Sequence, residues 1–231
     1  MKKLLSLAAV LLTAALIFTG CQNASSSSDD GDKLPGTWLS TTDFENFTNH
    51  EAFGPGSSFS SKGNGAYEYK LTDVSTTTKR PSEGQFKNHI YAVTRNADFT
   101  GFKATAKSTA SEYYGFAFNI NIEGENWKYY SVVLSNTSFT IDYNAPGADA
   151  ELAPWTKNNA IKASPEENNV TVYADKDSTI HILINNADVH QIKNPVLTQG
   201  YVGAICCLKY TDIANNTVCT ANYNFKEVQK K

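Results

Sequence analysis

The sequence lacks the features that mark several large classes of protein. Its 20 Lys and Arg against 23 Asp and Glu give a net charge of −3, and its basic residues are scattered, so it has no basic patch for nucleic acid. No pair of its four cysteines has the C-x-x-C spacing of a zinc ribbon or a thioredoxin-type site. It contains neither G-x-S-x-G nor H-E-x-x-H. The sequence therefore indicates no nucleic-acid partner, no metal, no cofactor and no standard catalytic motif.

Long apolar runs are also missing, except at the start of the chain. Met1-Lys2-Lys3 is a short positive region, and residues 4–19 are apolar apart from Ser6, Thr13 and the last residue, Thr19. Such a run is shorter than the about 20 apolar residues that a membrane-spanning helix needs. A charged start, a short apolar stretch and a small residue at the end are typical of a secretory signal.

The end of this run carries a more specific motif. Phe18-Thr19-Gly20-Cys21 resembles the lipobox of bacterial lipoproteins, with Phe18 where leucine is usual. The resemblance implies that 1–20 is a signal peptide and that Cys21 carries lipid, which anchors stably when more than one acyl chain is attached. We therefore expect a membrane-anchored protein of the bacterial cell envelope, at the outer membrane or cell surface rather than the inner membrane. The alternative is an ordinary secretory peptide followed by a chance cysteine.

The next segment, 21–33, reads CQNASSSSDDGDK and has no apolar anchor. A segment of this composition cannot bury enough surface to fold, so we expect a flexible tether of roughly 20 Å. Its acids are interpreted as solvating, because a calcium loop needs a longer ligand spacing that ends in glutamate. Residues 34–231 then form one domain, a size that suits a single β domain.

Within this domain, apolar residues alternate with period two, which is typical of half-buried strands. The clearest run is 113–122, in which Tyr114, Phe116, Phe118, Ile120 and Ile122 are predicted to share one face and Asn119 and Asn121 the other. Strands are also predicted over 127–134, with Tyr130, Val132 and Leu134 on one side, and over 139–143. Short turns between these three runs predict an antiparallel meander.

Further alternating segments lie on both sides of this meander. They are 89–94 and 99–107 before it, and 169–174, 178–185, 200–210 and 217–228 after it, with pieces at Trp38 and 67–71. Asn185-Asn186 is predicted to be a turn. Residues 146–165, which contain Pro154 and Trp155, are interpreted as a long irregular crossing. Many short strands separated by turns favour an all-β sandwich or barrel.

The order of strands from Ile90 onward resembles the concanavalin A-like sandwich superfamily, which includes laminin-G-like and jelly-roll glucanase domains. The matching segments are Ile90-Tyr91-Ala92-Val93-Thr94, Phe99-Thr100-Gly101-Phe102, Tyr114-Gly115-Phe116-Ala117-Phe118, Tyr129-Tyr130-Ser131-Val132-Val133, Ile180-His181-Ile182-Leu183-Ile184-Asn185, Gly200-Tyr201-Val202-Gly203 and Asn224-Phe225. The resemblance implies an antiparallel two-sheet jelly-roll sandwich. A lipocalin-like barrel is the alternative, because Pro35-Gly36-Thr37-Trp38 resembles the G-x-W of that group.

Two of the remaining cysteines lie on segments whose apolar faces could meet. Neighbouring strand residues face opposite sides, so Cys206 and Cys207 cannot both reach one partner. If Val202, Ala204 and Cys206 point inward, a Cys206–Cys219 disulfide is one interpretation. Buried thiols that pack as small apolar side chains are the other.

Candidate site residues lie mainly on the face opposite Phe116 and Phe118. Aromatic rings stack on sugars, and amide side chains offer both donors and acceptors. His181 alternates with the row formed by Ile180, Ile182 and Ile184, so it faces away from that core row, towards either a ligand or solvent. The alternative for the whole face is that the crossing at 146–165 covers its aromatics. The candidate ligand-binding residues are Tyr113, Asn119, Asn121, Trp127, Tyr129 and His181.

These observations predict a lipid-anchored β-sandwich that binds glycan or an envelope protein without catalysis. The jelly-roll glucanases carry a Glu-x-Asp-x-x-Glu strand that this sequence lacks, and Glu123 and Glu125 are interpreted as a solvated turn. A glycoside-active enzyme of the same fold, a structural or adhesion protein and a lipocalin-like carrier are the alternatives. Fold analogy alone underlies the sugar hypothesis.

Overall fold

The computed structural model describes residues 38–40, 58–71, 86–94, 96–108, 113–124, 126–209 and 219–230. The signal peptide, Cys21 and the tether lie outside these residues, so their assignments stay predictions. In the described ranges, no helix has both the length and the apolar character needed to cross a membrane.

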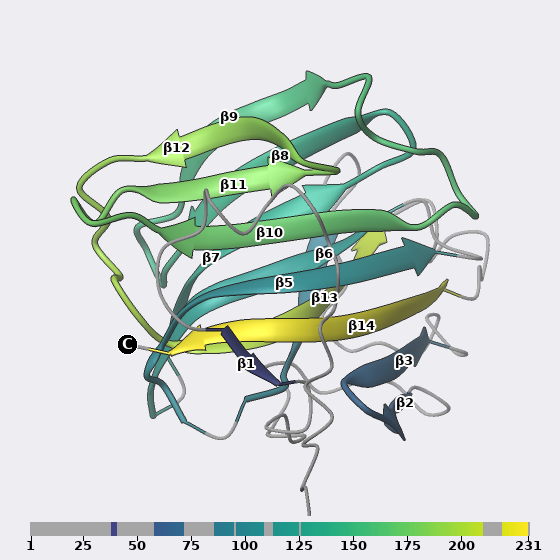
Figure 1. The fold of residues 1–231 in the computed structure, drawn as a ribbon, viewed down its shortest axis with the longest axis horizontal. Helices are drawn as coiled ribbons and strands as arrows, with labels where there is room; N and C mark the ends of the chain where they lie inside the picture. The colour runs from purple at the N-terminus through teal and green to yellow at the C-terminus, as the bar shows by residue number, and fades with distance from the viewer. Residues whose placement is uncertain are drawn as a thin grey trace, which may run out of the picture.

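The described strands form two antiparallel sheets, which Figure 1 shows as one layer in front of the other. The eight-stranded sheet has the order β12 (Ala187–Ile192), β11 (Ile180–Ile184), β10 (Asn168–Ala174), β5 (Phe99–Ser108), β14 (Cys219–Lys230), β3 (Ala66–Leu71) and β2 (Ser58–Gly63), and β1 (Trp38–Ser40) also pairs with β14. The six-stranded sheet has the order β4 (Phe86–Ala92), β13 (Tyr201–Lys209), β6 (Tyr114–Glu123), β7 (Asn126–Leu134), β8 (Ser138–Asn144) and β9 (Ala150–Lys157).

The core lies between the two sheets and is built from the inward-facing half of each alternating strand. Phe102 of the eight-stranded sheet and Phe116 of the six-stranded sheet meet there with ring centroids 5.1 Å apart, and Phe225 lies 5.6 Å from Phe116. Each of these rings is fully buried. Because the described strands form two separate sheets around one core, the two-sheet sandwich is confirmed and the lipocalin-like alternative is wrong.

The predicted meander is confirmed as β6, β7 and β8, but one expected face is wrong. Tyr130, Val132 and Leu134 all enter the core, as do Phe116 and Phe118. The pairing of β6 with β7 shifts between Phe118 and Asn121, and Asn119 has a positive φ of 49°. This bulge inserts a residue and reverses the alternation. Ile120 and Ile122 therefore lie on the outer face of the sheet, against a second apolar cluster.

The interpretation of residues 146–165 as an irregular crossing is also wrong, because this segment contains strand β9. β9 is the last strand of the six-stranded sheet, and an edge strand tolerates Pro154 because one side of it needs no ladder hydrogen bonds. Strands β2 and β12 were not predicted either. Asn185-Asn186 is confirmed as a turn, and the positive φ of both residues suits the tight hairpin that joins β11 to β12.

Cys206 lies in the core together with Val202 and Ala204, which is the orientation that the disulfide interpretation requires. The backbone of Cys219 begins β14, but its side chain lies outside the described side chains. The Cys206–Cys219 disulfide therefore stays a prediction.

Candidate functional site

The outer face of the six-stranded sheet, which points away from the core, carries three of the predicted site residues. Trp127, Tyr129 and Tyr113 all pack against the second apolar cluster there. Trp127 and Tyr129 are only 6% exposed each, and Tyr113 is half-buried. Trp127 and Tyr129 thus contribute to the floor of this face rather than presenting their rings to solvent. The buried members of the cluster are Ile90, Ala92, Ala117, Ile120, Trp127, Tyr129, Val133 and Ile205.

The two predicted asparagines do not lie beside Trp127 and Tyr129. Asn119 is buried in the bulge of β6, where its Nδ2 donates to the carbonyl oxygen of Leu197 at 2.9 Å. Asn121 is exposed and stands opposite Lys128, which lies between Trp127 and Tyr129 in β7 and so faces the other way. The prediction that both amides share the aromatic face is therefore wrong, because the bulge was not visible in the pattern.

His181 lies on the other sheet altogether, on the outer face of the eight-stranded sheet. It does face away from the row formed by Ile180, Ile182 and Ile184, as predicted, but it cannot join the other candidates. Its Nε2 is 3.1 Å from Asp175 and its Nδ1 3.2 Å from Asp188, and its ring stacks on Tyr173 at 4.8 Å. The hydrogen bond from His181 lowers the pKa of Asp175 below its ordinary value. Tyr173, Asp175, His181 and Asp188 thus use their polar groups and rings on one another, and their contacts connect β10, β11 and β12.

An exposed aromatic ring stands at the free edge of the six-stranded sheet. Trp155 of β9 is 39% exposed, and its ring meets that of Tyr113 edge-on, with centroids 5.3 Å apart. Tyr113 directly precedes β6, so β7 and β8 lie between the two residues in the sheet. The rings must therefore lean towards each other over those strands. From the sequence, Trp155 was expected in a crossing that could cover the face, and not as an accessible aromatic ring.

Beside this aromatic pair lies a row of polar side chains that was not predicted from the sequence. Ser131, Asp142 and Glu151 are direct neighbours across β7, β8 and β9, and so share the outer face. Asn144, two residues further along β8, donates from Nδ2 to Ser131 Oγ at 3.0 Å. The residues that remain accessible on this side define the β8–β9 surface: Tyr113, Asp142, Asn144, Glu151 and Trp155.

Asp142 is the most perturbed acid of this surface. Partial burial, and after it the charges of Glu151 and Asp149, raise the pKa of Asp142 from 3.8 to about 6. Among the described residues, no lysine or arginine forms an ion pair with Asp142 or Glu151. Asp142 is therefore protonated at pH values below about 6, where it can donate a hydrogen bond as well as accept one.

A pocket of about 340 Å³ lies beyond Trp155, where β8 and β9 come together at one end of the sheet. Its lining is rich in hydrogen-bond donors and has one apolar wall, Ile161. Asn158 is held in place by its own Oδ1, which accepts from the backbone nitrogen of Ala160 at 2.8 Å. We call this the Lys157 pocket, lined by Thr137, Lys157, Asn158, Asn159 and Ile161.

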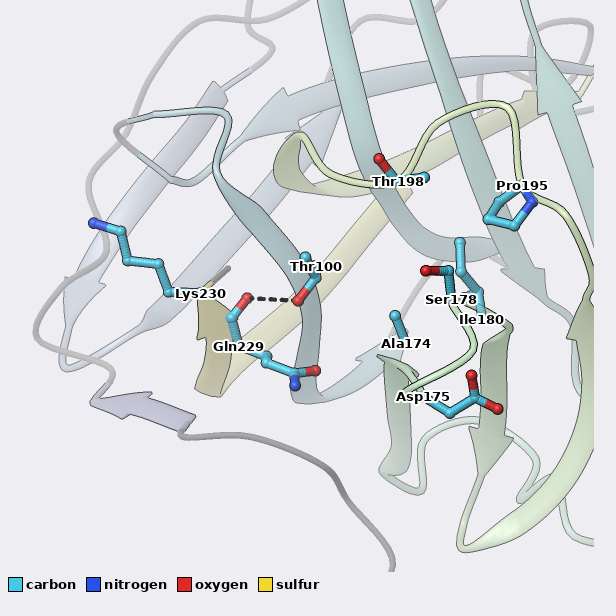
Figure 2. Close-up of a pocket in the computed structure, with 9 residues that line it drawn as sticks. All are labelled: Thr100, Ala174, Asp175, Ser178, Ile180, Pro195, Thr198, Gln229 and Lys230. Atoms are coloured by element: carbon cyan, nitrogen blue, oxygen red, sulfur yellow. Dashed lines mark hydrogen bonds between the residues drawn. The ribbon is translucent and has the colours of Figure 1, made fainter.

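A second pocket of similar volume, about 340 Å³, opens at the end of the eight-stranded sheet (Figure 2). It contains no aromatic ring. The Asp175 carboxylate at its side already accepts from the backbone nitrogens of Asp177 and Thr179 and from His181. Its lining offers less to a ligand than the β8–β9 surface does. In the part of the chain that the structure describes, no group of three or more His, Cys, Asp or Glu is arranged to hold a metal ion.

No protein-family model matches the chain, and no curated protein sequence does either. Solved structures do share its fold. A β-1,3-1,4-glucanase (lichenase) from a mouse hindgut metagenome matches with a TM-score of 0.55 and 13% identity over 84% of this chain and 99% of that chain. The carbohydrate-binding module CBM66 from Bacillus subtilis matches with a TM-score of 0.53 and 11% identity over 84% of this chain and 100% of that chain.

The carbohydrate recognition domain of Emp47p matches with a TM-score of 0.51 and 10% identity, and the match covers 87% of this chain and 99% of that chain. These identities are low enough that the likeness concerns the fold alone. The chain therefore has the concanavalin A-like, jelly-roll sandwich fold that the strand order predicted.

Proposed function

We propose that this protein is a lipid-anchored cell-envelope lipoprotein whose sandwich domain binds carbohydrate, without catalysis, at the β8–β9 surface. The observation that carries the proposal is the exposed Trp155 ring, held edge-on by Tyr113 beside a row of polar side chains. The fold supports it, because the structures that share it include a carbohydrate-binding module, a carbohydrate recognition domain and a glucanase.

The chemistry of the surface suits a sugar. An indole ring offers a flat apolar face for the C–H side of a pyranose, while its position at the edge of the sheet leaves room for the rest of the ligand. Further along β8 and β9, Glu151 accepts hydrogen bonds, Asp142 accepts or donates them, and the Asn144 amide can do both. A flat apolar contact, followed along the strands by groups of both hydrogen-bonding kinds, is what a hydroxyl-covered ligand requires.

The anchoring part of the proposal rests on the sequence. The lipobox-like Phe18-Thr19-Gly20-Cys21 and the Ser-rich tether together would hold the domain roughly 20 Å from the membrane. A domain at that distance would reach glycans of the envelope or of the surroundings. Metabolic labelling of the full chain with a fatty-acid probe tests this part, with Cys21→Ser as the variant that should lose the label.

The binding part is tested on the purified full chain in detergent against a polysaccharide panel that begins with β-1,3-1,4-glucan. We expect saturable binding that Trp155→Ala weakens at least about tenfold, equivalent to about 1.4 kcal/mol, with an unchanged Tm. Val196→Ala is the matched control, because Val196 is exposed but lies in the loop before β13. If the folded protein binds no polysaccharide, the carbohydrate proposal is wrong and an envelope protein becomes the partner to seek.

One observation favours a second function, hydrolysis of a glycosidic bond. Such reactions use two neighbouring carboxyl groups, of which one keeps its proton and the other is ionised. Asp142, with its pKa raised to about 6, and Glu151 on the next strand are neighbouring carboxyl groups. Release of reducing ends from a bound polysaccharide, lost in Asp142→Asn while binding persists, would establish this function. Binding with no release would leave the non-catalytic function.

A further inference from the structure

The edge strand β9 carries features along its length that the binding of a single sugar would not use. Glu151 stands near its start, Trp155 in its second half, and Lys157 at its end, where the Lys157 pocket opens. Trp155 and Glu151 lie on the outer face, as their contacts with Tyr113 and Asp142 show. Lys157 stands opposite Ser138, one residue from the pair of Thr156 with the core residue Phe139, so it also lies on the outer face.

These three points span more than one sugar ring. Glu151 pairs with Asp142 and Lys157 pairs with Ser138, and these two partners are four residues apart in β8. At about 3.3 Å per residue, the two ends of the line therefore lie about 13 Å apart along the strands, more than one sugar ring spans. A ligand that touches the acid pair, the indole ring and the Lys157 pocket at once must therefore be a chain of several units.

The two ends of this line have opposite hydrogen-bonding character. Asp142 and Glu151 present carboxyl oxygens at one end, and no ion pair within the described residues occupies them. At the other end, Lys157 is exposed, and the side-chain amides of Asn158 and Asn159 line the same pocket. Hydroxyl groups serve both ends, since each can donate to a carboxylate and accept from an ammonium or amide.

The position of β9 in the fold leaves the path along it open. It is the last strand of the six-stranded sheet, and Figure 1 shows it at the upper border of that layer. Trp155 and the neighbouring Pro154 are both exposed in the middle of the strand. Proline at an edge removes a backbone donor and discourages pairing with another strand, which keeps the edge available for a different kind of ligand.

We infer that the β8–β9 surface and the Lys157 pocket form one extended site, which binds the interior of an uncharged glycan chain lying along β9 rather than a single terminal sugar. This inference rests on the proposed carbohydrate-binding function. It adds the class of ligand, a polymer with several accessible units, and assigns Glu151 and Lys157 as contacts for its two outer units.

Isothermal titration calorimetry of the full chain tests the inference. The probes are β-1,3-1,4-glucan, its hexasaccharide and glucose. If the panel identifies another polysaccharide, the probes are that polymer, its hexasaccharide and its monosaccharide. We expect the hexasaccharide to bind at least about tenfold more tightly than the monosaccharide. Glu151→Gln and Lys157→Met should each weaken hexasaccharide binding about threefold to tenfold and leave monosaccharide binding unchanged. Both side chains are exposed, so neither change should lower the Tm.

The possible outcomes distinguish a failure of the extended site from a failure of the proposed carbohydrate-binding function. A monosaccharide that binds as tightly as the hexasaccharide would overturn the extended site and leave carbohydrate binding intact. The extended site is also overturned if Glu151→Gln and Lys157→Met both leave hexasaccharide binding unchanged. The control is Glu166→Gln, which changes an exposed acid outside the site. No binding of any form by the folded protein would overturn the proposed function itself, and the extended site with it.

Discussion

The acids on the two outer faces of the sandwich have different surroundings. On the eight-stranded sheet, the His181 ring lies within hydrogen-bond distance of the carboxylates of both Asp175 and Asp188, so these acids share a partner. On the six-stranded sheet, Asp142 and Glu151 stand side by side with the same sign and form no ion pair with a described cation. The first arrangement ties strands together, whereas the second costs stability.

This difference indicates which face interacts with a ligand. A fold has no structural reason to place two acids side by side on neighbouring strands, since like charges directly opposite each other destabilise a sheet. Strongly perturbed acids and locally unfavourable arrangements concentrate at functional sites. The exposed aromatic ring, Trp155, lies on the same side as the unfavourable acids. The eight-stranded face has Tyr173, but His181 covers its ring.

The largest expected effect comes from the core that both faces share. Phe116→Ala removes a fully buried ring that contacts Phe102, Tyr223 and Phe225, and should lower the free energy of unfolding by about 3–5 kcal/mol. Urea unfolding followed by tryptophan fluorescence measures this. Val196→Ala, at an exposed position, should stay within about 0.5 kcal/mol of the wild type. A loss below about 1 kcal/mol for Phe116→Ala would mean that the two sheets are not held together by this cluster.

A smaller effect should come from the acid pair. The folded-state pKa of Asp142 is raised to about 6, so its favourable contribution is complete below the unfolded value of 3.8 and is lost as the pH rises through 6. The wild type should therefore lose stability between about pH 4 and pH 7. Since Asp142 is partly open to solvent, which screens the effect, we expect Asp142→Asn to be more stable by about 1 kcal/mol at pH 8.

Urea unfolding at several pH values measures this difference, and Glu166→Gln, at an exposed acid outside the surface, is the control. An Asp142→Asn protein that follows the wild-type pH dependence would show that the carboxyl group is not perturbed. It would also remove the contrast between the two faces.

The smallest effect is expected on the eight-stranded face. His181→Gln keeps a polar side chain but removes the hydrogen bonds of the imidazole to Asp175 and Asp188, and polar contacts at the surface contribute little to stability. We expect the Tm to fall by roughly 1 °C at neutral pH, and polysaccharide binding to stay unchanged. If His181→Gln instead weakened polysaccharide binding, the ligand would lie on the eight-stranded face, and the β8–β9 site would be contradicted.

Much of the fold followed from local patterns. The alternation of Tyr130, Val132 and Leu134 correctly predicted the inner face of β7, and the turn at Asn185-Asn186 was correct as well. The prediction from alternation was wrong from Asn119 onward. Asn119 has a positive φ and lies in a bulge, so the residues after it in β6 face the side opposite to the one predicted. Nothing in the residue types around Asn119 distinguishes this bulge from continued alternation.

The site was less accessible to prediction than the fold. Asp142 lies in a short strand between Ile141 and Tyr143 and looks like any outward-facing acid. Its partner Glu151 is brought opposite it only by the register of β8 with β9, which shifts beside this pair. Trp155 was expected in a loop because Pro154 precedes it, and its exposure depends on β9 being the edge of the sheet.

The sequence by itself determined that this domain is all-β with a sandwich-type strand order, because the alternation of apolar and polar residues is a property of each strand alone. The lipobox-like motif likewise predicts export and lipidation without reference to any fold. Only the tertiary structure decided which strand lies at an edge, which acids become neighbours and which aromatic rings are buried. Those features depend on register and desolvation, which arise between segments distant in the chain.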